Sequence, residues 1–447
     1  AGLLGRAQLI PVRDGERRQI GPFDVEFIPV THSVPHGFAT AFHTPKGVIL
    51  HSGDFKIDLT PVDGRATDLA KIGALADGPG IRLLLSDSTN AEEDGHTDSE
   101  RSVGAVLARL FASHSDKRVI VACFASHIHR IQQIADAAIG SGRTVATLGR
   151  SMAKNVALAR SMGLLRIPDE HLVDIERIGD YDPRRVCVIS TGSQGEPMSA
   201  LSLMAAADNK WITVGEGDLV VLSSHAIPGN ETNVGKVIDG LCRLGAEVVH
   251  SGLAQVHVSG HAKREELKTL LALARPDCFI PVHGEFRHLT HHARLAQDMG
   301  VAPERVLLAE DGDVVELTDR GIDFVAEVPA GYLYVDGIVG DVGRGVLRDR
   351  RVLAEEGVVM VVVTVDAKSG EVLTGPEIIT RGWVYAPEAE GLLGEARQAV
   401  LEALEEAAAS GSVDFETLRR RARSALGKFV SERTRRRPMI VPVVMEV

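Results

Sequence analysis

The chain has 447 residues, of which 44% are apolar and 25% are charged, and its formal net charge at pH 7 is −12. These proportions are ordinary for globular proteins, and the length allows two or three domains with sizeable cores. The negative net charge argues against a surface that coats polyanions in general, so a nucleic acid would have to be met by a local basic channel.

The chain also lacks the marks of a membrane or secreted protein. No apolar run approaches the roughly 18 residues that span a bilayer, and the first residues lack the apolar stretch of a signal peptide. The four cysteines, Cys123, Cys187, Cys242 and Cys278, lie far apart and form no CxxC pair. This pattern indicates buried thiols in a reducing compartment rather than disulfides or a zinc ribbon. We therefore expect a cytoplasmic protein with no membrane partner.

Strand and helix patterns alternate along the first three quarters of the chain. Apolar runs that predict buried strands lie at 47–50, 82–85, 118–123, 186–190, 219–223, 246–249 and 278–282. Helical patterns lie at 128–139, 152–162, 232–243, 263–274 and 286–298. Such alternation predicts an α/β architecture with sheets covered on both sides.

The pattern changes towards the C-terminus. Turns and short β segments fill 310–335, which we interpret as including a linker. Beyond it the sequence predicts a valine-rich strand at 357–366, helices at 390–409 and 414–434, and a final strand at 439–444. These elements amount to a compact α/β module of roughly 105 residues.

Three of the predicted strands in the first part lead into residue types that bind metal ions. His32, Asp54 and His283 each stand at the mouth of a short apolar strand, and the segment HVSGH (257–261) adds two imidazoles beside a glycine turn. Nitrogen and oxygen ligands of this kind suit Zn²⁺ or Mn²⁺ and leave positions open for water and substrate. The pattern indicates a hydrolytic metal site with part of its ligand set missing.

Eight segments make the chain resemble ribonuclease J, of the β-CASP branch of the metallo-β-lactamase superfamily. They are THSVP (31–35), HSGDFKID (51–58), SDSTNAE (86–92), FASHIHRIQQ (124–133), STGSQGEPMSAL (190–201), HVSGHAKREEL (257–267), IPVHGEFRHL (280–289) and RRRPMIVPVVMEV (435–447). They occur in the family's order. The spacing agrees as well, with Asp54 22 residues after His32 and His283 22 residues after His261.

The resemblance implies an α/β fold of three domains. A discontinuous metallo-β-lactamase αββα sandwich would cover 1–97 and 247–325, with a β-CASP α/β domain inserted at 98–246. A linker at 326–340 would lead to a C-terminal α/β domain at 341–447 that supports oligomerisation. The family's HxHxDH motif is absent from these 447 residues. We expect it in a segment before Ala1, the alternative being a homologue that has lost it.

The resemblance also implies a ligand set. His32 would coordinate one divalent metal ion, His283 the other, and Asp54 would bridge both. A bridging carboxylate offsets the repulsion between two cations and fixes the separation that two-metal hydrolysis uses. Zinc is the expected metal, with manganese or magnesium as alternatives.

Catalytic and substrate-binding roles follow from the same resemblance. His261 would protonate the leaving O3′ of RNA, and Asp87 would orient His261 or a ligand histidine. The residues expected to contact substrate are His257, Val258, Ser259, Gly260, His261 and Ser33. The segment at 124–130 runs from a strand into a helix start, where free N–H groups favour anions. The implied activity is 5′→3′ exonucleolytic and endonucleolytic cleavage of single-stranded RNA in processing and decay, leaving 5′-phosphates.

Some of these residues also have simpler structural interpretations, and the sequence leaves alternative functions of the chain open. A histidine after a strand is more often structural, and Asp87 before a helix could be a simple N-cap. His291 and His292 are expected on a solvated helix face. The chain could instead be a DNA-directed β-CASP nuclease, a small-molecule metallohydrolase, or a non-catalytic RNA-binding scaffold.

The expected partners are single-stranded RNA, one or three further copies of the chain, and other RNA-decay proteins. An arginine-rich stretch in the last module bears on this expectation. Arginines gather at 419–423 and 433–437, on a predicted helix and its exit. They would form a solvated face, guide RNA, or dock a second subunit.

Overall fold

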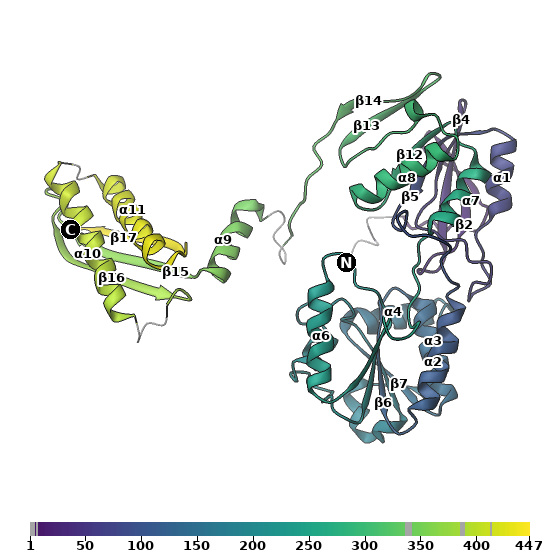
Figure 1. The fold of residues 1–447 in the computed structure, drawn as a ribbon, viewed down its shortest axis with the longest axis horizontal. Helices are drawn as coiled ribbons and strands as arrows, with labels where there is room; N and C mark the ends of the chain where they lie inside the picture. The colour runs from purple at the N-terminus through teal and green to yellow at the C-terminus, as the bar shows by residue number, and fades with distance from the viewer. Residues whose placement is uncertain (1–4, 6–7, 336–341, 385–388, 412–413) are drawn as a thin grey trace. The chain divides into compact units, whose positions relative to one another are not determined.

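The computed structural model describes residue 5 and residues 8–335, 342–384, 389–411 and 414–447. The chain forms two compact units, unit 1 (residues 1–328) and unit 2 (residues 329–447), which Figure 1 draws as ribbons. Both units mix helices and strands, which confirms the expected α/β class.

A six-stranded sheet in unit 1 follows the order β1-β2-β3-β4-β5-β12. Its strands are β1 (Arg17–Ile20), β2 (Phe23–Val30), β3 (Gly37–Thr44), β4 (Gly47–His51), β5 (Ile81–Asp87) and β12 (Cys278–Val282). The strands β1 to β4 pair antiparallel, whereas β5 runs parallel to both β4 and β12. The carboxyl ends of β4, β5 and β12 therefore meet at one edge.

The two faces of this sheet are covered differently. Helices α1 (Leu69–Asp77), α7 (Arg264–Ala274) and α8 (Phe286–Asp298) bury one face in a shared apolar core. A hairpin of β13 (Asp313–Thr318) and β14 (Gly321–Glu327) packs against the other, where Leu83 and Ile280 meet Ile322. Among the described residues, the second sheet of the expected sandwich is this two-stranded hairpin.

A second six-stranded sheet in unit 1 is parallel throughout and has the order β11-β10-β6-β9-β7-β8. Its strands are β6 (Arg118–Ala122), β7 (Thr144–Leu148), β8 (Leu172–Val173), β9 (Val186–Ser190), β10 (Asp218–Leu222) and β11 (Glu247–His250). Short 3-10 helices occupy Asp169–His171, Ile175–Asp180, Pro183–Arg185 and Pro303–Arg305.

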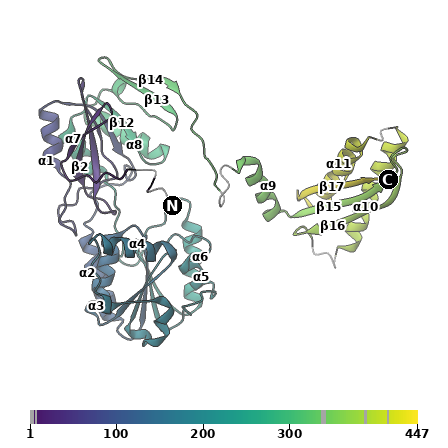
Figure 2. The same cartoon turned by 180° about the vertical axis from the view of Figure 1, so that it is seen from behind.

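Helices cover both faces of the parallel sheet, as Figures 1 and 2 show from opposite sides. On one face lie α2 (Arg101–Ser113), α3 (Ile128–Gly140) and α4 (Arg150–Ser161), and on the other lie α5 (Ala200–Ala205) and α6 (Glu231–Arg243). Because side chains alternate along a strand, Val119 and Val121 enter the first core, whereas Ile120 and Ala122 enter the second. Burial on both faces explains why these strands are continuous apolar runs.

Unit 2 packs two long helices on one face of a three-stranded sheet. The sheet has the order β16-β15-β17, with β15 (Val358–Val365), β16 (Val372–Arg381) and β17 (Met439–Glu446). Alternate valines of β15 are fully buried under α10 (Glu390–Ala409) and α11 (Phe415–Thr434). A further helix, α9 (Gly343–Glu355), precedes the sheet. Strand β17 is an edge strand.

The sequence patterns identified most of these elements. All seven apolar runs listed from 47 to 282 are strands, and the five helical patterns are α3, α4, α6, α7 and α8. The segment 310–335 is more ordered than a linker, because the β13–β14 hairpin occupies most of it. The sequence patterns did not list β1–β3, β7, β8, β16, α1, α2, α5 or α9. The interior of β16 carries Gly375 and Pro376, a pair that normally indicates a break in a strand. None of the described helices has both the length and the apolar content that crossing a membrane requires.

Candidate metal centre

The candidate metal ligands follow three strands of the first sheet of unit 1, β2, β4 and β12, which are not adjacent to one another in that sheet. His283 follows β12 directly, and Asp54 lies in the loop after β4. His32 lies two residues beyond β2, and Thr31 beside it pairs with Lys56, two residues after Asp54. Because that pairing joins the two loops, His32 and Asp54 come together from separate strands.

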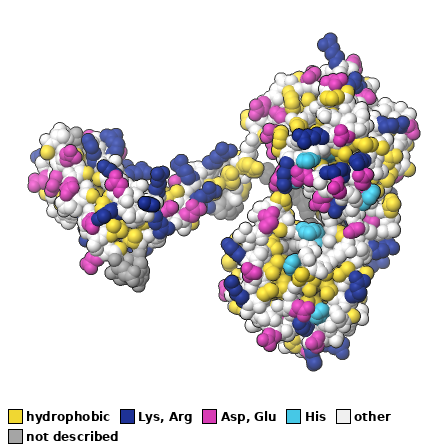
Figure 3. All heavy atoms as spheres, viewed as in Figure 1, with side chains coloured by type: hydrophobic (Ala, Val, Ile, Leu, Met, Phe, Trp, Pro, Cys, Tyr) yellow, Lys and Arg dark blue, Asp and Glu magenta, His cyan; other side chains and the backbone are white. Residues whose placement is uncertain are grey.

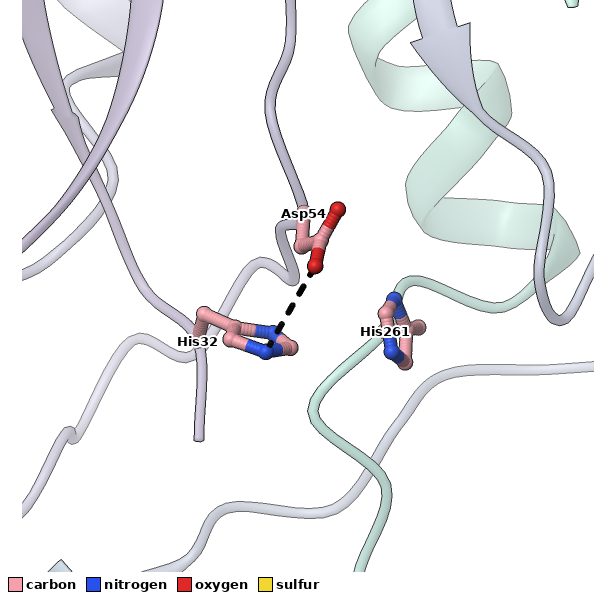
Figure 4. Close-up of side chains that lie close together, drawn as sticks. All are labelled: His32, Asp54 and His261. Atoms are coloured by element: carbon pink, nitrogen blue, oxygen red, sulfur yellow. Dashed lines mark ion pairs between the residues drawn. The ribbon is translucent and has the colours of Figure 1, made fainter. Parts of the chain in front are cut away.

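The carboxylate of Asp54 lies between two imidazoles. Its Oδ2 is 3.9 Å from Nε2 of His32, and its Oδ1 is 3.8 Å from Nε2 of His283. Figure 4 shows Asp54 with His32 and with His261, the third member of this group of possible ligands. Separations of 3.8–3.9 Å are too long for hydrogen bonds but suit atoms that share one ion. One oxygen therefore faces each histidine.

Both histidines are oriented by their other ring nitrogen. Nδ1 of His32 donates to the carbonyl of Gly260 at 2.9 Å, which leaves the Nε2 lone pair on the side of Asp54. Burial lowers the pKa of His32, so its ring is neutral and able to coordinate. Nδ1 of His283 lies 2.8 Å from the Thr89 hydroxyl, and a hydrogen bond to Asp87 raises its pKa. Orientation by a carbonyl or carboxylate is typical of metal-binding histidines. The residues present fit divalent ions with nitrogen and oxygen ligands.

Asp87 connects His261 to His283. It is the last residue of β5 and is only 2% exposed. Its Oδ2 accepts from Nδ1 of His261 at 2.6 Å, and its Oδ1 is 3.3 Å from Nδ1 of His283. Burial alone would raise the pKa of Asp87, but the hydrogen bonds from His261 and His283 outweigh it and hold the pKa far below the usual range. Asp87 is therefore an anion that fixes both rings, whose centroids are 5.3 Å apart in a stacked arrangement.

Two glycines permit the close approach of these loops. Gly53 has a φ of +63°, and a Cβ there would lie 2.5 Å from the carbonyl oxygen of Phe38. A Cβ on Gly260 would lie 2.8 Å from Cε1 of His32. Any larger residue at either position would have to displace the loop that carries Asp54 or the ring of His32.

The predicted substrate contacts fall into two groups. Ser33, Ser259 and Gly260 line a small cavity of about 20 Å³ beside His32, which is room for one or two waters. Val258 is 6% exposed within the apolar core, so only its backbone can meet a ligand. Burial and the nearby Arg130 guanidinium lower the pKa of His257 to about 2, so this ring is a neutral hydrogen-bonding group.

Two residues that the sequence analysis gave no role support this arrangement. The hydroxyl of Thr89 lies 2.7 Å from Oδ1 of Asp87 and close to Nδ1 of His283. The side-chain amide of Asn90 donates to Oγ of Ser259 at 2.9 Å and to the carbonyl of His261 at 3.0 Å. Both belong to the segment SDSTNAE, and that membership was the only signal in the sequence.

The helix start at 124–130 differs from the expected open anion site. Arg130 is fully buried and makes a bidentate ion pair with Glu100 at 2.6 and 2.8 Å. The same guanidinium donates to Oγ of Ser223 and to the carbonyl of Val256. Arg130 therefore links the helix to the turn that leads to His257, and its charge is not presented to a ligand.

His292 also differs from expectation. It is fully buried, and its Nδ1 is hydrogen-bonded to Oγ of Ser88 at 3.0 Å. Its Nε2 has no hydrogen-bond partner among the described residues. Burial lowers the pKa of His292 to about 3. The expectation of a solvated position was wrong for His292, because α8 packs this side chain against Phe279 of the sheet, whereas His291 is exposed as expected.

Comparison with known proteins gives consistent matches over most of the chain. Residues 116–241 match the family described as "Ribonuclease J, beta-CASP domain", and residues 345–447 match "Ribonuclease J C-terminal domain". Residues 246–308 match "Zn-dependent metallo-hydrolase RNA specificity domain".

Individual relatives agree with these matches. Ribonuclease J of Mycobacterium tuberculosis is 45% identical over 439 residues, which cover 98% of this chain and 78% of that protein. Ribonuclease J2 of Bacillus subtilis is 41% identical over 425 residues, covering 95% and 76%. Ribonuclease J of Thermus thermophilus is 42% identical over 444 residues, covering 99% and 76%.

Proposed function

The chain belongs to the ribonuclease J family, a family of metal-dependent nucleases that act on RNA, and from that premise we propose a two-ion hydrolysis of single-stranded RNA. The proposed activity attacks RNA both from the 5′ end and internally. The single observation that carries the two-ion proposal is Asp54, whose two oxygens face two different histidines.

His32, His283 and Asp54 would hold the ions in this proposal. Imidazole nitrogen with carboxylate oxygen favours zinc, and manganese remains compatible with the same atoms. When bound, such ions lower the pKa of a coordinated water and offset the charge on the phosphate. Gly260 and Asp87 contribute by fixing the two rings, through the carbonyl and carboxylate contacts described above.

His261 would serve the leaving group. A water oxygen forms the new bond to phosphorus, the P–O3′ bond breaks, and the O3′ takes a proton. The products are a 5′-phosphate and a 3′-hydroxyl. Because Nδ1 of His261 is held by Asp87 at 2.6 Å, Nε2 is the atom left to deliver that proton. The arrangement parallels other acid–base histidines that a buried carboxylate orients.

The Asp54 assignment is tested by removing the carboxylate. We expect Asp54→Ala in the full-length protein to lose bound metal after dialysis and to lower kcat/KM by at least about 10³-fold, the loss of several kcal/mol. Asp298→Ala, which removes an exposed carboxylate at the end of α8, is the matched control. Elemental analysis and cleavage of labelled RNA are the measurements.

Two results would contradict parts of this proposal. Two tightly held ions in the Asp54→Ala variant would show that Asp54 is not the bridge. Unaltered protein that binds RNA but never cleaves it would favour the scaffold alternative.

Ser33, Ser259 and Gly260, which line the cavity beside His32, are proposed to contact oxygens of the terminal 5′-phosphate. Hydroxyls and a turn backbone can cradle phosphate oxygens, and a space of this size admits a single oxygen of that group rather than the whole phosphate. A bulky residue in place of Ser259 should mainly reduce the preference for 5′-monophosphorylated over 5′-hydroxyl RNA. Matched RNAs that differ only at that end, compared at fixed salt, provide the test. Equal losses of cleavage rate on both RNAs would contradict the assignment of these residues to the 5′-phosphate. They would not affect the role proposed for His261.

Self-association through unit 2 is also proposed. The face of its sheet opposite α10 and α11 carries half-exposed apolar side chains on all three strands, including Met360, Val362 and Ile379. An exposed apolar face of this kind is typical of a subunit interface. Sedimentation of Met360→Glu should show smaller species than the unaltered protein. An unchanged sedimentation coefficient would place the interface elsewhere.

A further inference from the structure

Unit 2 is nearly neutral as a whole, but its helices separate the two signs of charge. Helix α10 carries Glu390, Glu395, Glu402, Glu405 and Glu406 against Arg397 alone. Helix α11 has the opposite balance, with five arginines and Lys428 against Glu416 and Glu432. Helix α9 adds four arginines against Asp349 and Glu355. In Figure 3, Lys and Arg side chains gather on α9 and on the part of the unit next to it.

The basic helices border a groove, which we call the α9–α11 groove. It consists of two adjoining depressions of about 540 and 460 Å³ that share five residues, Asp349, Arg420, Arg423, Met439 and Ile440. Arg348 of α9 lines one end, and Lys428 of α11 lines the same depression. Its floor is the start of the edge strand β17, which is apolar and only half-buried. Five basic residues line the two depressions against two acidic ones, Asp349 and Glu416, so the groove combines walls of net positive charge with an apolar floor.

The arginines of the sequence cluster divide into two groups. Arg433 pairs with Glu395, and Arg436 pairs with Glu356 at 3.3 Å, so both are neutralised away from the groove. Within the groove, Arg420 donates to the hydroxyl of Thr417. Among the described residues, the ion pairs of α11 involve Arg419 and Arg433, and neither Arg423 nor Lys428 has a carboxylate at ion-pair distance. Several positive charges of the groove are therefore available to a ligand.

We propose that the α9–α11 groove binds the phosphate backbone of single-stranded RNA, as a second RNA contact separate from the metal centre. The proposal rests on RNA being the substrate of the family. Guanidinium groups bind phosphates in a bidentate manner, and half-buried apolar side chains such as Met439 provide a sequence-tolerant surface for bases. A protein interface is the less favoured occupant, because interface centres are depleted of unpaired charge. Such a groove also explains how a protein of net charge −12 can hold a polyanion.

The test compares two double variants of the full chain that lose the same charge. Arg420→Ala with Arg423→Ala removes the shared cations of the groove. Arg397→Ala with Arg421→Ala is the control, since both residues are exposed and line neither depression. The probes are fluorescein-labelled poly(A) of graded length, with binding measured in EDTA over a salt series. Cleavage of a short oligonucleotide is measured separately with metal present.

We expect the groove variant to bind long poly(A) at least about tenfold more weakly, while the control variant binds like the unaltered protein. The slope of log K against log salt should fall by about 1.4 if two phosphate contacts are lost. Cleavage of the short oligonucleotide should be the same in all three proteins. Arg420→Lys with Arg423→Lys should retain more affinity than the double alanine variant, because lysine keeps the charge but loses the bidentate contact.

Equal affinity of the groove and control variants for long RNA would overturn the proposal. A changed sedimentation coefficient with unchanged RNA affinity would also overturn it, and would identify the groove as a protein interface. Loss of short-oligonucleotide cleavage in all proteins would instead count against the proposed hydrolysis. Because binding is measured without metal, that failure would leave the groove result intact.

Discussion

Unit 1 holds its reactive side chains at strand ends with polar partners, whereas unit 2 presents its arginines on the outer surfaces of helices. Asp87 accepts hydrogen bonds from two histidines and is almost fully buried. Arg419, by contrast, pairs only with Glu416 one helical turn away, and both side chains are about half-exposed or more.

The difference follows from what each region has to do. Proton transfer and metal binding need atoms fixed to within a fraction of an ångström, so the rings of unit 1 are immobilised by carbonyls, carboxylates and hydroxyls. Binding a flexible polyanion needs mainly charge density, which exposed and mobile arginines provide. Substitutions in unit 1 should therefore have large effects that depend on position. Those on the surface of unit 2 should have small effects on stability.

The largest expected effect tests whether His261 acts in every mode of cleavage. His261→Ala should lower kcat by about 10²- to 10⁴-fold, because protonation of the leaving group is common to exonucleolytic and endonucleolytic reactions. Rates on 5′-labelled linear RNA and on circular RNA measure the two modes. A loss of rate confined to one of the two RNAs would show that His261 positions that RNA and does not protonate the leaving group.

A second prediction tests how strictly the position of His32 is fixed. Gly260→Ala would place a Cβ 2.8 Å from Cε1 of His32 and should reduce kcat/KM about 100-fold. Gly73→Ala is the matched control, since a Cβ there meets nothing within 4 Å and α1 gains a better helix former. Normal cleavage by the Gly260→Ala variant would mean that the site tolerates a displaced ring.

The buried His292 links the folding of unit 1 to pH. Its pKa of about 3 lies below the ordinary value of 6.5. Between these two pH values His292 is protonated in the unfolded chain and neutral in the folded chain. The stability it contributes is complete above pH 6.5 and is lost as the pH falls towards about 3.

Between pH 8 and pH 5 this loss amounts to about 2 kcal/mol, which His292→Gln should not show. Urea unfolding in a Trp383→Phe background makes Trp211 of unit 1 the only tryptophan reporter. Identical pH dependence in both proteins would mean that His292 does not control this transition.

The smallest expected effect lies on the surface of unit 2. Arg419→Ala should change the unfolding free energy by no more than about 0.5 kcal/mol, because an exposed pair one turn apart on a helix contributes little. Trp383 reports this unit in a Trp211→Phe background. A loss of unfolding free energy above about 1.5 kcal/mol would contradict the contrast between the two units. It would show that a surface charge of unit 2 also stabilises the fold.

Local patterns in the sequence were enough to identify most elements and the residue types of the candidate site. Apolar runs and helical periodicity are properties of a few neighbouring residues, so β5, β12, α3 and α8 could be located without any long-range information. The motif segments also named His32, Asp54, His261 and His283. What each of them does remains a prediction.

Only the tertiary structure decided which side chains meet and which are removed from solvent. Asp87 and His261 are 174 positions apart and yet share a 2.6 Å hydrogen bond. The burial of His292 depends on packing against Phe279. The neutralisation of Arg130, in α3, depends on Glu100, which lies at the start of α2. Sequence alone could not reveal these contacts, because burial and charge pairing depend on partners that only the folded chain brings within reach.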